Sequence, residues 1–171
     1  MALLDFLTGR KRPAAGTRRE SVSHLKAALL ALNRPTSPWQ VRDGRPEGAD
    51  LVAEWRIVDA KWYEVFAKAG LSKTSQVLIK FDEAAAEVRS VDRDWTVEWR
   101  VGTPHLALSA DGFRGQKAEV SFGMGVAFRE EDLSYGKVYE YRFNSKELKG
   151  PLQDVVTGMG WTWKPVAFGK L

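Results

Sequence analysis

The chain has 171 residues, which is enough for one domain that buries about two-thirds of its unfolded surface without covalent cross-links. It contains no cysteine, which excludes disulfides, cysteine-ligated zinc, iron–sulfur clusters and thiol catalysis. The net charge of +4 comes from the N-terminal region. Residues 1–35 hold seven basic and two acidic side chains, while residues 36–171 hold 19 basic and 20 acidic side chains. Since the body is near neutral, we do not expect nucleic acid as a partner.

Residues 1–7 form a short apolar cluster, and residues 8–19 combine basic charge with Gly and Pro, as a flexible linker does. The apolar run is too short for a secretory signal, contains Asp5, and is followed rather than preceded by its positive charges. No segment reaches the roughly 18–20 apolar residues that cross a bilayer. We therefore expect a cytoplasmic protein of bacterial type, with a flexible basic arm at residues 1–19 and a single α+β domain at residues 20–171.

The first helix is expected over about residues 18–33, with Thr17 as its N-cap. The following segment, residues 36–49, is rich in Pro and Gly and is typical of a loop. Within it, Trp39 and Val41 favour a short edge strand.

The pattern of residues 51–57 predicts a strand. One side carries Leu51, Ala53, Trp55 and Ile57, and the other carries Val52, Glu54 and Arg56. A second helix is expected over residues 60–69. The chain then reads almost entirely as strands joined by short turns, one of them at Asp92–Asp94. The expected strands cover residues 76–81, 88–91, 95–101, 104–110, 117–122, 126–128 and 137–143.

Asn144 is expected to cap a last helix. Its apolar stripe comprises Leu148, Leu152, Val155, Val156 and Met159. The tail, residues 160–168, favours a short strand that Pro165 confines to an edge or a bend. The sum is an α+β fold with three helices and a strongly curved antiparallel sheet, or partly open barrel, of about eight strands.

Three strands share one pattern, in which an apolar residue, Glu, an aromatic residue, Arg and an apolar residue follow one another. They are Ala53–Ile57, Val97–Val101 and Tyr139–Phe143. Because the central aromatics share a face with Val, Ile and Ala, we expect Trp55, Trp99 and Tyr141 in the core. The Glu and Arg residues of each copy are expected on the outer face, where opposite charges form cross-strand pairs.

The sequence offers no catalytic, cofactor or metal motif, and we expect none of these sites. His24 and His105 lack the spacing of a metal pair, and no nucleophile elbow accompanies His105. The acidic run Glu130–Asp132 lacks the pattern of a calcium loop. The glycine pairs at residues 123–125 and 158–160 lack the residues of a phosphate loop.

The N-terminal arm is the best functional candidate, because a small apolar cluster precedes a polybasic patch. Apolar insertion and attraction to anionic lipid are weak signals that add. The expected binding residues are Leu3, Leu4, Phe6, Leu7, Arg10, Lys11 and Arg12.

The leading hypothesis is a non-enzymatic binding or assembly module that this arm recruits to an anionic membrane surface or to a protein partner. A carrier of a small hydrophobic ligand or lipid inside an aromatic-lined sheet is the alternative, since large aromatics often line apolar pockets. Two further possibilities stay open, that the protein is an enzyme of unknown reaction class and that it forms a homo-oligomer.

Overall fold

The computed structural model describes residues 2–56, 73–100, 103–108, 126–129, 134–137, 145–167 and 170–171. Several expected features lie outside these residues. They are the helix at residues 60–69, the strand at residues 117–122, nearly all of the strand at residues 137–143, Asn144 and Tyr141.

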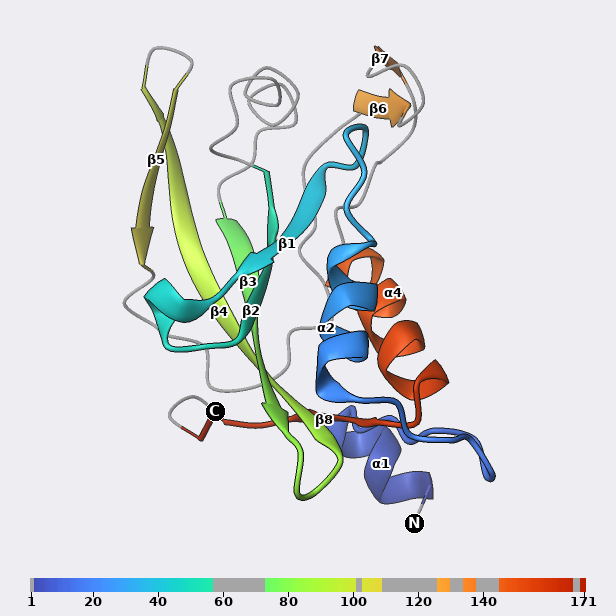
Figure 1. The fold of residues 1–171 in the computed structure, drawn as a ribbon. Coiled ribbons are helices and arrows are strands. Elements are labelled where there is room, and N and C mark those ends of the chain that lie inside the picture. The colour runs from blue at the N-terminus through green and yellow to red at the C-terminus, as the bar shows by residue number, and fades with distance from the viewer. Residues whose placement is uncertain are drawn as a thin grey trace.

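The described strands form one mixed sheet and one small hairpin. Five strands pair antiparallel in chain order, and β8 pairs with the start of β4 in parallel (Figure 1). The five are β1 (Trp39–Asp43), β2 (Leu51–Trp55), β3 (Lys73–Asp82), β4 (Glu87–Arg100) and β5 (Thr103–Leu108), and β8 is Thr162–Pro165. The hairpin joins β6 (Val126–Arg129) to β7 (Ser134–Lys137).

The α+β class is therefore confirmed, with a sheet that is antiparallel apart from β8. The described strands do not close into a barrel, because the pairing path ends at β1 and at β5. An eight-stranded, strongly curved sheet stays a prediction.

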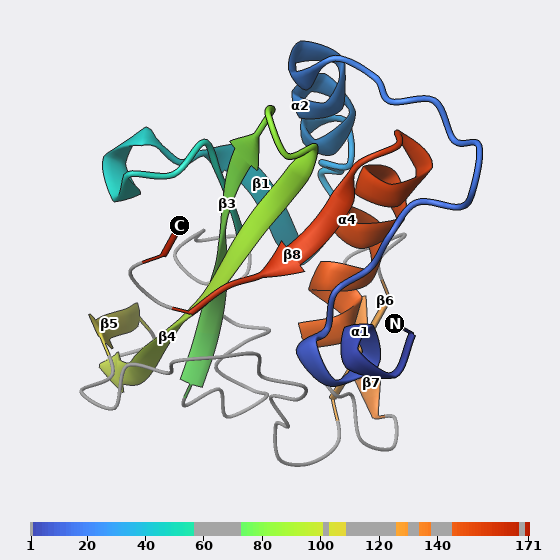
Figure 2. The same cartoon turned by 90° about the horizontal axis from the view of Figure 1, so that it is seen from below.

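The helices α2 (Val22–Leu30) and α4 (Ser145–Gly158) lie side by side on one face of the sheet (Figures 1 and 2). The short helix α1 (Ala2–Thr8) lies at the end of the molecule that also holds β8, and a 3-10 turn spans Arg45–Glu47. The prediction that α2 begins near residue 18 under a Thr17 cap is wrong. Ser21 is the cap, because its hydroxyl accepts the N–H of His24 at 3.2 Å.

The predicted turn at Asp92–Asp94 is also wrong, because β4 runs through it without a break. Asp92 and Asp94 stand opposite Val77 and Ser75 of β3 and are 2% and 5% exposed. Aspartate favours turns when nothing else satisfies its carboxylate. Here Lys149 of α4 forms an ion pair with Asp92, and tertiary structure overrides the local preference.

The core lies between the sheet and the two helices. Trp55, predicted to be buried, is 4% exposed, and the apolar stripe of α4 is buried at Leu148, Leu152 and Val156. Trp99 lies within β4, but its side chain is outside the description. The opposite face of the sheet is partly apolar too, because Val52 packs with Ala49 and Leu78.

Asn33 covers the edge of β1 with its side chain. Its Nδ2 donates to the Val41 carbonyl and its Oδ1 accepts the Val41 N–H, both at 2.7 Å. The carboxamide thus replaces the peptide group of a neighbouring strand and satisfies an edge that another chain could otherwise pair with.

We expect Asn33→Ala to lower the free energy of unfolding by about 2 kcal/mol, since two net hydrogen bonds are lost. Asn33→Asp is expected to lose at least as much, because it replaces the donor to the Val41 carbonyl with a carboxylate oxygen that repels it. Urea unfolding measures both variants. An alanine variant as stable as the original chain would show that the carboxamide contributes nothing to the edge.

Candidate binding surface

The exposed large hydrophobic side chains among the described residues all lie on α1. Leu4 is 65% exposed, Phe6 83% and Leu7 72%. At about 100° per residue these positions fall on one side of the helix, with Asp5 on the other. Leu3 belongs to the same helix, but its side chain is outside the description. Because exposed apolar patches are frequent at interaction sites of soluble proteins, we take α1 as part of the candidate surface.

Arg10 does not belong to the exposed charge of this surface. Its guanidinium is 2.5 Å from the carboxylate of Glu87, which also accepts from Lys164 at 2.8 Å. The Glu87 side chain is only 8% exposed, so the three residues form a shielded group that ties the N-terminal region to β4 and β8.

Arg12 is exposed, but Asp5 offsets its charge. The Arg12 Nε donates to Asp5 Oδ2 at 2.8 Å. This hydrogen bond holds the pKa of Asp5 below its usual value, so the carboxylate stays charged at neutral pH. The pair therefore contributes little net charge to the surface.

Lys11 holds the chain against β8 through its backbone. Its N–H donates to the Trp163 carbonyl at 3.0 Å, and its carbonyl accepts the Trp163 N–H at 2.8 Å. The Lys11 side chain is exposed, as is that of Arg18. These two cations have no ion pair within the described part of the chain.

We call residues 9–20 the strap, because they cross β8 and the end of α4 (Figure 2). At its far end Glu20 donates its N–H to the Met159 carbonyl at 3.0 Å and accepts the indole N–H of Trp161 at 2.9 Å. The guanidinium of Arg19 lies 5.6 Å from the centre of the Trp161 ring. Gly160, at φ +78°, lets the strap approach closely, since a Cβ there would stand 2.6 Å from the Arg18 carbonyl oxygen.

These contacts fix the strap in the structure. The division between a flexible arm at residues 1–19 and a domain at residues 20–171 stays a prediction about the chain in solution.

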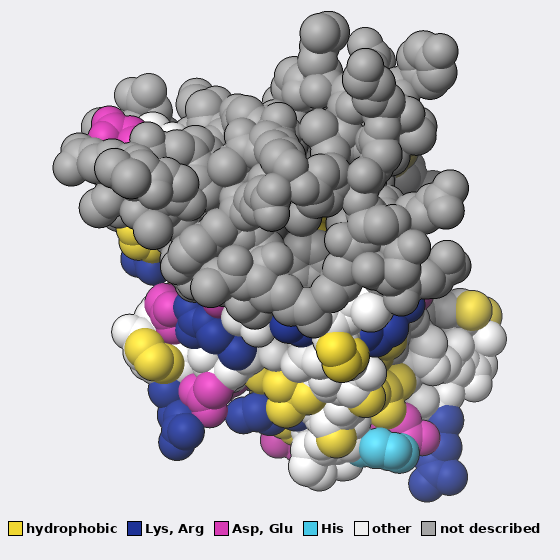
Figure 3. Space-filling view, turned by 90° about the horizontal axis from the view of Figure 1, so that it is seen from above, with side chains coloured by type: hydrophobic (Ala, Val, Ile, Leu, Met, Phe, Trp, Pro, Cys, Tyr) yellow, Lys and Arg dark blue, Asp and Glu magenta, His cyan; other side chains and the backbone are white. Residues whose placement is uncertain are grey.

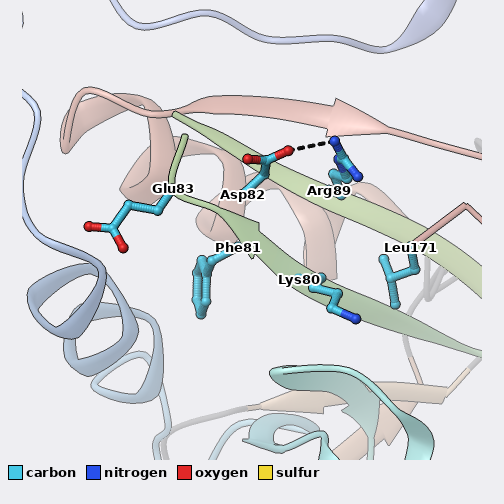
Figure 4. Close-up of a pocket in the computed structure, with 6 residues that line it drawn as sticks. All are labelled: Lys80, Phe81, Asp82, Glu83, Arg89 and Leu171. Carbon is cyan, nitrogen blue, oxygen red and sulfur yellow. Dashed lines mark hydrogen bonds and ion pairs between the residues drawn. The ribbon is translucent and has the colours of Figure 1, made fainter. Parts of the chain in front are cut away.

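A surface pocket of about 310 Å³ lies at the β3–β4 turn (Figure 4). It is lined by Lys80, Phe81, Asp82, Glu83, Arg89 and Leu171. The charges of Arg89 and Asp82 are paired at 2.5 Å across it. With both signs of charge in its wall, the pocket shows no preference for a ligand of one charge.

The outer face of the sheet carries a hydrogen-bonded network around Glu54. Its carboxylate accepts from Gln40, from Gln76 at 2.6 Å and from Arg42, which also binds Glu47. The expected outward position of Glu54 is consistent with this network, but its ion-pair partner is Arg42. Arg56 donates instead to the carbonyls of Trp39 and Arg34. The hydrogen bond from Arg42 lowers the pKa of Glu47.

The remaining polar candidates show no site chemistry. His24 is an exposed residue of α2, and its ring lies 3.0 Å from Glu20, on a face that mixes hydrophobic and charged side chains (Figure 3). Among the described residues no group of three His, Asp or Glu is placed to hold a metal ion. Within the same residues, every helix is too short or too polar to cross a membrane.

The chain matches no protein-family model, and neither a curated protein nor a solved structure shows significant similarity to it. Its function must therefore be inferred from geometry. The structure brings Leu4, Phe6, Leu7 and Lys11 to one end of the molecule and pairs Arg10 and Arg12 with acids. Sequence reasoning missed Arg18 as an exposed cation.

Proposed function

We propose that the protein is a non-enzymatic binding module that attaches peripherally to an anionic membrane surface through α1 and the strap. The observation that carries this proposal is the exposure of Leu4, Phe6 and Leu7 near Lys11, an exposed cation that forms no ion pair with the described residues. The cytoplasmic face of a membrane, which carries anionic lipid, is the expected location.

Charge complementarity favours a lipid surface over a neutral protein groove. The acidic groups nearest to α1 are already bound, Asp5 by Arg12 and Glu87 by Arg10 and Lys164. The surface therefore presents apolar side chains and positive charge, which is the combination that inserts at a headgroup boundary. No described observation favours the carrier alternative, because Trp39, Trp55, Trp161 and Trp163 are packed in the core.

The test is co-sedimentation of the full chain with vesicles of phosphatidylcholine alone or with 30% phosphatidylserine, at low and at physiological salt. We expect binding to the anionic vesicles that weakens as salt rises. Phe6→Ser and Leu7→Ser should each reduce the affinity by roughly tenfold or more, since each loses about 1.5 kcal/mol of apolar burial.

Matched charge variants distinguish an effect of charge at this surface from an effect of the net charge of the whole chain. Lys11→Ala should weaken binding clearly more than Arg18→Ala, although each removes one exposed positive charge, because Arg18 lies at the far end of the strap beside Gly160. Asp5→Asn should strengthen binding several-fold, because it removes the charge that offsets Arg12.

Equal recovery of the chain with and without anionic vesicles would overturn the proposal. If sedimentation velocity then showed self-association that Phe6→Ser abolishes, α1 would instead be an interface between copies of this chain.

A further inference from the structure

The strap is attached to the domain at both ends of its course. Near α1, Lys11 exchanges two backbone hydrogen bonds with Trp163, and Arg10 pairs with Glu87. Farther along, Glu20 bonds to Met159 and Trp161. Only two residues, Gly9 and Arg10, separate the end of α1 from Lys11, so the position of Lys11 restricts where the helix can lie.

We infer that α1 docks on anionic lipid as a preformed surface, with the strap still paired to β8. This inference rests on the proposed function, and it names the residues that meet the lipid as Leu4, Phe6, Leu7 and Lys11. Arg10 stays on Glu87 and does not contact the headgroups. The end of the molecule that holds α1 and β8 then faces the bilayer in one orientation (Figure 1).

The alternative mode is release of the arm, in which α1 and residues 9–12 leave the domain and lie on the membrane as a flexible tether. Release would expose the Trp163 N–H and carbonyl and would leave Glu87 with Lys164 as its cationic partner. A preformed surface instead loses little conformational freedom on binding, and this favours affinity. The two modes make opposite predictions at Trp163 and at Glu87.

The experiment is amide hydrogen exchange of the full chain, alone and with vesicles containing 30% phosphatidylserine. The amide of Trp163 and that of Lys11 report the pairing directly, since each donates to the other residue. We expect both amides to keep or gain protection in the bound state. Loss of protection at both on binding would overturn the inference and identify release.

A second measurement uses Gly160→Ala, with Gly158→Ala as its matched control, because neither substitution changes a charge. A Cβ at Gly160 would stand 2.6 Å from the Arg18 carbonyl oxygen and displace the strap, whereas a Cβ at Gly158 meets nothing within 4 Å. We expect Gly160→Ala to bind anionic vesicles several-fold more weakly than Gly158→Ala. Equal or tighter binding of Gly160→Ala would contradict a preformed surface.

Failure of the proposed function gives a different result. In that case the unaltered chain does not bind the vesicles, and its exchange pattern is the same with and without them.

Discussion

Lys149→Ala is expected to lower the free energy of unfolding by about 3–5 kcal/mol, because it leaves Asp92 charged and buried without this cation. Lys149 lies on α4 and is 5% exposed, and Asp92 on β4 is 2% exposed. The pair therefore joins the last helix to the longest strand of the sheet in surroundings that exclude water. Urea unfolding followed by tryptophan fluorescence measures the loss.

The double variant Lys149→Met with Asp92→Leu provides the control. Replacing both charges of a buried pair with apolar groups of similar volume is often neutral or stabilising. We therefore expect the double variant to be much more stable than Lys149→Ala. If Lys149→Ala cost less than about 1 kcal/mol, the pair would not be excluded from water in solution.

Trp161→Ala is expected to destabilise the chain by a similar amount, about 3–5 kcal/mol, through the loss of a large buried side chain. The Trp161 side chain is 1% exposed and meets Phe81 edge to face, with ring centres 6.5 Å apart. It also holds the strap through Glu20 and Arg19. The variant should thus weaken both the core and the attachment of the strap.

Trp161→Phe separates the two contributions. It keeps an aromatic ring in the core but removes the indole N–H that donates to the Glu20 carbonyl, so a loss of only about 1–2 kcal/mol is expected. Guanidinium unfolding gives the stabilities, and hydrogen exchange at the Glu20 amide reports the strap. An alanine variant with unchanged exchange at Glu20 would show that the strap is held without Trp161.

The sequence predicted the elements whose local pattern agrees with their final surroundings. Alternation located β2 and the burial of Trp55, and helical spacing located the buried residues of α4. It failed at Asp92 because the residue that satisfies this carboxylate is 57 positions away in the chain. Local propensity carries no information about such a partner.

The candidate surface shows the same limit. Composition identified Leu4, Phe6, Leu7 and the basic cluster, but it counted Arg10, Lys11 and Arg12 as equivalent charges. The fold distinguishes them, because Glu87 binds Arg10 and Asp5 binds Arg12 while the Lys11 side chain stays exposed. Asp5 is visible in the sequence, but which basic residue it binds depends on how the chain turns after α1.

The pairing of Lys11 with Trp163 has a consequence for the order of folding. Strands β1 to β4 are neighbours in sequence order, whereas Lys11 of the strap pairs with Trp163 of β8, far along the chain. Contacts of such long sequence separation form late, because the chain loses conformational entropy in closing the loop before the contact contributes favourable free energy. We therefore expect α1 to stay unattached until β8 is available for pairing, so that the surface proposed to bind lipid forms later than the antiparallel part of the sheet.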